Sequence, residues 1–361
     1  MSRREKGIRT EKIPKLRPHA KRGLFPDPEC PEKQAGNAMA LIEVDRLSKA
    51  YEKIIAVDGI SFLIHEKEIF GFLGPNGAGK TTTINMLTGL ARPDQGSFRI
   101  GGIDCTDDPK AAQHLIGVVP DESNLYPELT GFDNLCFCAA LYGMRKRERE
   151  TGARKLLETF DLTEAGNRKF GGFSKGMKRK LAIAAGIIHN PPILFLDEPT
   201  TGIDVASARQ IRQILAGLND SGTTIFLTTH YIEEAERLCH RIAFIVEGRV
   251  VRIDTLANLI QPIQDKHVMQ LAVSNSKPGL HAILSEAFPH LVFQALPQGV
   301  LRVEADKPVQ VGPLVRFLEE QGAEVSEARK VRLSLEDVFV RITGIEVDAL
   351  RKEKEKKGGG A

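Results

Sequence analysis

Residues 74–81 read Gly-Pro-Asn-Gly-Ala-Gly-Lys-Thr, a complete G-x-x-x-x-G-K-S/T loop of the kind that binds phosphate. Its three glycines permit backbone angles that a Cβ atom would forbid, so successive amide N–H groups can turn towards a phosphate. The lysine of this pattern supplies a charge to the β- and γ-phosphates, and the final hydroxyl can ligate Mg²⁺. We expect a nucleoside triphosphate to contact Gly74, Pro75, Asn76, Gly77, Ala78, Gly79, Lys80, Thr81 and Thr82.

The residues on either side predict the strand and the helix that such a loop connects. Residues 69–73 form an apolar run, which indicates a buried strand. Residues 82–90 are predicted to be helical, and the N-terminus of a helix there adds the positive end of its dipole to the phosphate site. The context therefore supports a nucleotide site rather than a chance glycine-rich turn.

The composition bounds the class of protein. A chain of 361 residues is long enough for two domains, and its 42% hydrophobic and 27% charged residues exclude a largely disordered protein. No apolar stretch approaches the roughly 18 residues that cross a bilayer, and the start lacks the apolar segment of a signal peptide. Five scattered cysteines, an odd number, predict reduced cytosolic thiols rather than a disulfide framework.

Residues 1–38 are expected to form a disordered, basic extension. They carry ten Lys or Arg and five Asp or Glu, a local +5, which leaves −2 for the remainder because the whole chain carries +3. Five prolines and the lack of an apolar period indicate disorder. A solvated tail, an arm that binds membrane or nucleic acid, and a true translation start at Met39 are three interpretations that stay open.

Strand and helix patterns alternate over residues 39–262, which predicts an α/β domain built on a parallel sheet. We expect an antiparallel β-subdomain around the phosphate loop and a helical subdomain at about residues 108–180. The predicted strands are 41–44, 60–64, 69–73, 96–100, 193–196 and 224–227. The predicted helices are 82–90, 132–142, 150–160 and 178–189.

Residues 263–345 predict a small C-terminal α+β domain. Six segments follow one another in the order β-α-β-β-α-β, which is the ferredoxin-like arrangement. Residues 346–361 are charged and rich in glycine, and we expect a flexible tail there. The predicted strands are 268–273, 291–296, 300–303 and 323–328, and the predicted helices are 280–287 and 309–320.

Two carboxylates, Asp197 and Glu198, directly follow the apolar run 193–196. Ligands of open α/β sheets bind at this end of the strands. Asp197 would therefore hold Mg²⁺, and Glu198 would orient and polarise the attacking water. An exposed acidic strand end explains this stretch equally well when it is taken alone.

Two further stretches bear on phosphate. Ser174 and Gly176 precede a predicted helix and make a second anion site, although an ordinary helix cap has the same pattern. His230 follows the predicted strand 224–227, where a histidine can sense the γ-phosphate and position water. Two phosphate sites on one chain are redundant unless they face different ligands or different subunits.

In this order and spacing, the phosphate loop, residues 173–177, residues 194–198, Asp204 and His230 resemble the nucleotide-binding subunits of ATP-binding-cassette (ABC) transporters. The resemblance covers roughly residues 41–260. Within that family, the chain is most similar to ATPases of drug- or polymer-exporting systems whose permease is a separate polypeptide. Those ATPases often share a C-terminal segment such as the one at 334–344.

The resemblance implies a P-loop ATPase with a RecA-like core, and a role for each matched position. Tyr51 stacks on adenine, and such stacking contributes on the order of 1–3 kcal/mol. The implied catalytic residues are Glu198, His230 and Lys80, with Mg²⁺ held by Thr81, Asp197 and Asp121. Besides the loop, the implied ATP contacts are Tyr51, Ser174, Gly176 and Asp204.

The resemblance also implies cofactors and partners. ATP and Mg²⁺ are the expected cofactors. Ser174 and Gly176 are expected to bind the γ-phosphate of the opposite protomer, so the working unit is a homodimer that closes on two ATP molecules and reopens after hydrolysis. An integral-membrane permease is the expected partner, on the cytoplasmic face of a prokaryotic membrane, and no nucleic acid is expected.

Three positions depart from the family's usual pattern. Asp121 stands where the family usually has Gln as a Mg²⁺ ligand. Because Asp can ligate the ion but also repel the γ-phosphate before the metal binds, we expect slower or more metal-dependent turnover. Lys175 and Met177 replace Gly and Gln beside Ser174 and Gly176, and Lys175 either points into solvent or adds a charge near the phosphate.

Residues 120–142 lie where such ATPases contact the cytoplasmic helices of their permease. Leu125, Tyr126, Leu129 and Phe132 either form that groove or belong to the core of the helical subdomain.

Two other functions fit the sequence less well. A soluble ABC ATPase that acts on ribosomes or nucleic acid generally has two cassettes, a long coiled coil or a zinc insertion, and the sequence shows none of these. A GTPase would carry an Asn-Lys-x-Asp base-reading motif, which is absent too. An ATP-hydrolysing subunit of an ABC exporter is therefore the favoured prediction.

Overall fold

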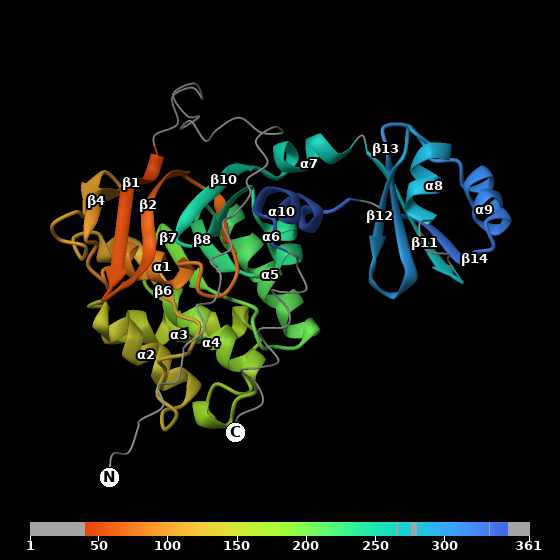
Figure 1. The fold of residues 1–361 in the computed structure, drawn as a ribbon. Helices are drawn as coiled ribbons and strands as arrows, with labels where there is room; N and C mark the ends of the chain where they lie inside the picture. The colour runs from red at the N-terminus through yellow and green to blue at the C-terminus, as the bar shows by residue number, and fades with distance from the viewer. Residues whose placement is uncertain (1–39, 265, 276–279, 332, 346–361) are drawn as a thin grey trace, which may run out of the picture. The chain divides into compact units, whose positions relative to one another are not determined.

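The computed structural model is drawn in Figure 1. The extension and the tail that the sequence predicts at the two ends lie outside the residues that it describes. Within the described part of the chain, no helix is long and apolar enough to cross a membrane. The described residues are 40–264, 266–275, 280–331 and 333–345.

A six-stranded sheet forms the centre of residues 40–264. Its strands are β3 (Ile69–Leu73), β6 (Ile116–Val119), β7 (Ile193–Asp197), β8 (Thr224–Thr229), β9 (Arg241–Val246) and β10 (Arg249–Thr255). They run in the order β10-β9-β3-β8-β7-β6. All neighbours pair in parallel except β10, which pairs with β9 in the antiparallel sense. The predicted parallel sheet is confirmed.

Alternate residues of the central strands face two different cores, as expected for a sheet that is covered on both sides. Phe195 and Phe226 point to one core, and their neighbours Leu194 and Leu227 point to the other. The apolar runs of the sequence follow from this double burial. The first face is covered by α1 (Lys80–Leu87), and the second by α4 (Lys175–Ile187), α5 (Val205–Asp220) and α6 (Ile232–Leu238).

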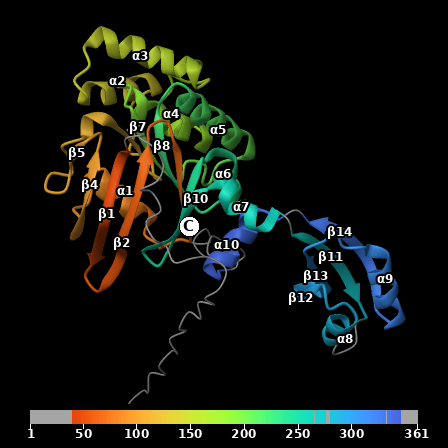
Figure 2. The same cartoon turned by 90° about the horizontal axis from the view of Figure 1, so that it is seen from above.

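An antiparallel sheet packs on the face that carries α1. Its strands are β1 (Ala40–Tyr51), β2 (Ile54–His65), β4 (Gln95–Ile100) and β5 (Ile103–Asp104), in the order β2-β1-β4-β5 (Figure 2). Phe62 of β2 stacks on Phe70 of β3 with ring centroids 5.6 Å apart. Burial of such aromatic side chains joins the two sheets. The predicted antiparallel β-subdomain is confirmed.

The helical insertion consists of α2 (Gly131–Leu141) and α3 (Lys146–Thr159), which share a core with α4. Figure 1 shows these helices gathered together. The prediction that the helical pattern begins near residue 108 is wrong, because residues 116–119 form β6 and pair with β7. An apolar run of four residues cannot be assigned to a helix or a strand by periodicity alone.

Residues 267–331 form the predicted β-α-β-β-α-β order. The elements are β11 (His267–Ser274), α8 (Leu280–Ala287), β12 (Val292–Leu296), β13 (Val300–Ala305), α9 (Val311–Glu320) and β14 (Glu324–Val331). The strands pair antiparallel in the order β12-β13-β11-β14, which is the ferredoxin-like order. Leu284 of α8 and Leu318 of α9 share one core with Leu271, so both helices cover the same face of the sheet.

Two more helices, α7 (Leu256–Gln264) and α10 (Leu335–Thr343), border this domain in the sequence. Val338 and Phe339 of α10 are buried in the core of residues 40–264. The Phe339 ring meets that of Phe244 edge-on, with centroids 5.4 Å apart. Helix α10 thus packs with the domain of residues 40–264, although its residues lie in the range predicted as accessory domain.

Candidate active site

Residues 74–79 of the phosphate loop join β3 to α1. Gly77 and Gly79 have φ angles of 77° and 103°, left-handed values that favour glycine. Gly74 has no such angle, but a Cβ there would lie 2.2 Å from the carbonyl oxygen of Ile245. Two of the three glycines therefore have the predicted backbone role, and the third is required by a close approach to β9.

The other loop residues divide by exposure. Ala78 is buried, and its N–H donates to the Pro75 carbonyl over 3.2 Å. Asn76 and Thr81 are exposed, and Thr82 is half-buried in the first turn of α1. The loop therefore holds its shape through backbone contacts while its outer side chains stay accessible.

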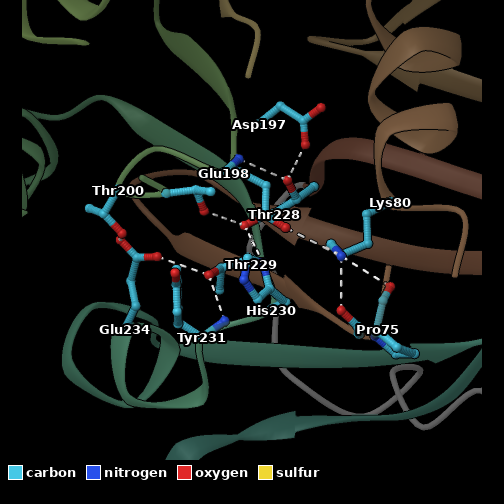
Figure 3. Close-up of polar contacts among 12 residues, drawn as sticks. Pro75, Lys80, Asp197, Glu198, Thr200, Thr228, Thr229, His230, Tyr231 and Glu234 are labelled. Carbon is cyan, nitrogen blue, oxygen red and sulfur yellow. Dashed lines mark hydrogen bonds and ion pairs between the residues drawn. The ribbon is translucent and has the colours of Figure 1, made fainter. Parts of the chain in front are cut away.

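Lys80 lies across the loop with a buried side chain. Its Nζ donates to the carbonyl oxygens of Gly74, over 2.8 Å, and Pro75, over 3.1 Å. The same nitrogen lies 3.3 Å from Oε1 of Glu198 (Figure 3). The loop and the end of β7 thus meet at this ammonium group.

Asp197 and Glu198 lie at the carboxyl end of β7, as predicted. The Asp197 carboxylate accepts a hydrogen bond from Thr228 Oγ1 on the neighbouring strand β8. Glu198 has a φ of 50°, which costs a residue with a side chain on the order of 1 kcal/mol. Its N–H donates to the Thr228 carbonyl over 3.1 Å, so β8 holds both acidic residues.

Three groups surround the Glu198 carboxylate (Figure 3). His230 Nδ1 lies 2.7 Å from Oε2, Thr201 Oγ1 donates to the same oxygen over 2.9 Å, and Lys80 faces the other oxygen. Burial alone would raise the pKa of Glu198, but the hydrogen bond from His230 and the charge of Lys80 outweigh it and lower that pKa. Glu198 is thus held ionised.

His230 directly follows β8. With Nδ1 at Glu198, its Nε2 is buried and has no hydrogen-bond partner among the described residues. A buried ring nitrogen without a partner is costly, and it can be satisfied by water or a ligand. The predicted histidine is therefore adjacent to the predicted carboxylate, with one nitrogen left for a further contact.

Sequence reasoning missed a buried acid, Glu234 of α6. Its carboxylate accepts from Thr200 Oγ1 over 2.6 Å and from Thr229 Oγ1 over 2.9 Å (Figure 3). Burial raises the pKa of Glu234, and these hydrogen bonds oppose that rise. The helical spacing of Glu234 and buried Leu238 would have placed it on the inner face of α6.

The second predicted anion stretch forms the start of α4. Ser174 is the N-cap, and its Oγ accepts from Met177 N–H over 3.2 Å. Lys175 is exposed. A Cβ on Gly176 would lie 2.3 Å from Ser207 Oγ, so glycine lets α4 approach α5 there. The predicted helix began at residue 178, whereas α4 begins three residues earlier.

Asp204 caps the neighbouring helix α5. Its carboxylate accepts from Ser207 Oγ over 2.7 Å and from Ser207 N–H over 2.9 Å. These hydrogen bonds lower the pKa of Asp204. Ser174, Gly176 and Asp204 thus gather at the N-termini of two adjacent helices, and within the described part of the chain their hydrogen bonds do not reach the phosphate loop.

The remaining predicted residues lie at the ends of other strands. Tyr51 ends β1 with 46% of its surface exposed, and Lys49 Nζ lies 5.5 Å from its ring centroid. Asp121 follows β6 and is largely exposed. Desolvation by the surrounding protein raises the pKa of Asp121, and the charge of the Arg179 guanidinium lowers it. The charges of Asp197 and Glu198 raise that pKa further. Asp121 therefore lies within electrostatic reach of both carboxylates.

The ABC transporter family matches residues 57–201, a range that contains the phosphate loop and both carboxylates of β7. The chain is 36% identical over 310 residues to the Nod factor export ATP-binding protein I of Burkholderia thailandensis, covering 86% of this chain and 99% of that relative. It is 37% identical over 312 residues to the daunorubicin/doxorubicin resistance ATP-binding protein DrrA of Streptomyces peucetius, covering 85% and 93%. The chain belongs to the ABC transporter family.

A solved structure of the same fold supports this membership. The ATP-binding cassette MJ0796, as a post-hydrolysis dimer bound to ADP and Pi, aligns with a TM-score of 0.56 and 29% identity. The alignment covers 60% of this chain and 98% of that chain. The predicted ABC cassette fold is confirmed, and the chain is an ATPase subunit of an ABC transporter.

These similarities decide between the functions weighed from the sequence. ABC transporter subunits bind and hydrolyse ATP and work with membrane permeases. The relatives named above are bacterial and carry export or drug resistance in their names. A soluble ABC ATPase that acts on ribosomes or nucleic acid is therefore not favoured.

Proposed function

We propose that this ABC ATPase drives export from the cytoplasmic face of a bacterial membrane, as one of two identical protomers beneath a separate permease. The observation that carries the proposal is the Glu198 carboxylate, which lies between Lys80 and His230 beside the phosphate loop. A carboxylate held ionised there can orient and polarise a water molecule for attack on the γ-phosphate.

The arrangement of the residues assigned to phosphate binding supports a site that two protomers share. Lys80 and the loop glycines form one half. Ser174 and Gly176 form the other half at the N-terminus of α4, where free N–H groups and the helix dipole favour an anion. Since these two residues are grouped with Asp204 rather than with their own loop, we assign them to the nucleotide of a second protomer.

The residues present fit a magnesium ion. Thr81, Asp197 and Asp121 offer hydroxyl and carboxylate oxygens, the hard donors that Mg²⁺ prefers. Arg179 donates hydrogen bonds to the main-chain carbonyls of both Asp121 and Asp197, which holds these two residues next to one another at the end of the sheet. A bound Mg²⁺ would neutralise negative charge that develops on the phosphates during hydrolysis. The three residues would then hold the ion in place.

The negative charge of Asp121 leads to a prediction about how the ATPase rate depends on Mg²⁺. Asp121→Gln is expected to lower the Mg²⁺ concentration that gives half-maximal ATPase rate, or to raise the rate at saturating Mg²⁺. The neutral amide removes a negative charge from a place where desolvation, and after it the charges of Asp197 and Glu198, raise the pKa of Asp121. ATPase rates of the two proteins are measured across a Mg²⁺ titration, and identical curves would refute the expectation.

A groove on the helical insertion supports the docking of a permease helix. It has a volume of about 410 Å³ and is lined from α2 and α3, with the phenylalanines Phe132 and Phe137 among its walls. Of the four residues that the sequence assigned either to this groove or to the core, Leu129 and Phe132 line the groove, while Leu125 is buried in the core. Tyr126 is half exposed and packs edge-on against Phe137, with ring centroids 5.1 Å apart.

Phe137→Asp is expected to abolish co-purification with the permease while the ATPase rate of the isolated subunit stays within about twofold. Phe137 is 40% exposed, so the change removes apolar docking surface, and within the subunit it removes the edge-on contact with Tyr126. The measurement is capture of the permease from detergent-solubilised membranes of cells that produce both subunits. Leu141→Asp on the same helix is the matched control, since Leu141 is 71% exposed and lies outside the groove lining. Equal capture by both variants would contradict this docking surface.

A further inference from the structure

Arg179 of α4 has a buried guanidinium, with only 7% of the residue exposed. Among the described residues, its hydrogen bonds all go to main-chain carbonyl oxygens. Nε donates to Pro199 over 3.0 Å, Nη1 donates to Pro120 over 2.5 Å and to Asp121 over 3.1 Å, and Nη2 donates to Asp197. One side chain thus connects segments that lie up to 59 residues from Arg179 in the sequence.

These carbonyls belong to the segments that carry the acidic residues of the active site. Pro120 and Asp121 follow β6, Asp197 ends β7, and Pro199 comes directly after Glu198. The guanidinium therefore donates hydrogen bonds to the main-chain carbonyls of Asp121 and Asp197. Because it also donates to Pro199, it holds the residues on both sides of Glu198. Its five N–H groups lie in one rigid plane, so they fix the relative positions of their acceptors.

The same residue lies on the helix that begins at Ser174. Arg179 follows Ser174 by five residues, which is less than two turns of α4. A displacement of the N-terminus of α4 relative to the sheet would therefore move the guanidinium, and with it the segments of Asp121 and Glu198. A single buried side chain connects the two halves of the chemistry within one protomer.

We propose that Arg179 is a positioning residue for ATP hydrolysis, which couples the start of α4 to the placement of Asp121, Asp197 and Glu198. The inference rests on the roles assigned to these carboxylates above. Arg179 does not touch the nucleotide in this account. It holds the acidic residues in the geometry that hydrolysis requires, and it does so from the helix that binds the partner's nucleotide.

A residue that only filled space in the core would need no charge. Burying a cation is costly unless its hydrogen-bonding groups are satisfied, and the carbonyls named above satisfy Arg179. Burial lowers the pKa of Arg179, and the charges of Asp121 and Asp197 oppose that effect. The acceptors and the nearby carboxylates together explain why arginine is tolerated at this buried position.

The test compares Arg179→Met and Arg179→Lys in the full chain, with Lys178→Met as the matched control. Lys178 is the neighbouring cation on α4, and its Nζ lies over the Phe170 ring, 5.6 Å from the centroid. We expect Arg179→Met to lower kcat by about 10- to 100-fold, because small misplacements of catalytic groups are that costly. The Kd for an ATP analogue should stay within about twofold, and the Mg²⁺ concentration for half-maximal rate should rise. Arg179→Lys should restore part of kcat, and Lys178→Met should leave it unchanged.

The opposite results overturn the inference. If both Arg179 variants keep the wild-type kcat, or if kcat and analogue binding fall together with the melting temperature, Arg179 is a structural residue only. If Arg179→Met does not fold, Arg179→Lys tests the positioning role instead. A lowered kcat with an unchanged Kd for the ATP analogue supports that role, and an unchanged kcat contradicts it. If Glu198→Gln still hydrolyses ATP, the carboxylate roles fail. If Glu198→Gln is inactive and the Arg179 variants are normal, only the positioning role fails.

Discussion

Replacing Glu198 by Gln is expected to reduce ATP turnover by at least about 100-fold while ATP binding is retained, since a positioned general base contributes about 10²- to 10⁴-fold. The amide has nearly the same shape as the carboxylate, so it can keep its contacts with Thr201 and His230. It loses the negative charge that polarises water and pairs with Lys80. Chemistry should therefore suffer far more than folding or binding.

Two measurements on Glu198→Gln check this expectation. The steady-state ATPase rate should fall, and the Kd for ATP should change by no more than a few-fold. Because the variant binds ATP without consuming it, it should also accumulate as an ATP-bound dimer. A variant that hydrolyses ATP at the wild-type rate would show that another group activates the water.

Replacing Lys80 by Ala has the other large expected effect, which is loss of ATP binding itself. The ammonium is the one charge that the loop directs at the β- and γ-phosphates. The carbonyls of Gly74, which is buried, and of Pro75, which is half-buried, lose their donor, and water that enters the space left by the deleted side chain can hydrate them. We therefore expect at least about a 100-fold rise in the Kd for ATP, with the fold intact.

The Lys80→Ala result separates binding from chemistry. Equilibrium binding of a fluorescent ATP analogue measures the Kd, and thermal unfolding without nucleotide checks the fold. Lys110→Ala is the control, because Lys110 is an exposed lysine outside the site. Unlike Glu198→Gln, the Lys80 variant should show no ATP-dependent dimer. Tight analogue binding by Lys80→Ala would mean that the loop amides alone hold the phosphates.

The sequence patterns predicted the parts of the fold that local chemistry determines. The strand at 69–73 and the loop after it combine an apolar run with required glycines, and both are found in the structure. The short strand β6 was not predicted, because four residues carry no usable period. The helix α10 has an amphipathic pattern, but no pattern says which core it will join.

The residues of the site also divide into those that the local sequence predicts and those that it does not. Asp197 and Glu198 could be predicted because they end a buried strand, where ligands bind in α/β sheets. The roles of Arg179 and Glu234 could not, because they depend on partners distant in the sequence, such as Pro120 and Thr200, and helical spacing gives only the inward position of Glu234. The start of α4 was placed three residues late, since a Ser-Lys-Gly stretch has low helix propensity until its cap is recognised.

The measurement that tests the shared site most directly mixes two inactive variants. Lys80→Ala disables the loop of one chain, and Ser174→Asp disables the start of α4 in the other. Aspartate is also a good N-cap, so it keeps α4 while adding a negative charge where the γ-phosphate of the partner would bind. A mixed dimer then contains one intact site, made of one loop and the opposite helix terminus.

If the site is shared, the mixture hydrolyses ATP well above the sum of the two separate preparations. The gain should grow with total protein concentration, because it depends on the two chains meeting. Each variant alone should remain near background. A mixture whose rate equals that sum at every concentration would show that Ser174 serves the nucleotide of its own chain, and it would contradict a site shared between protomers.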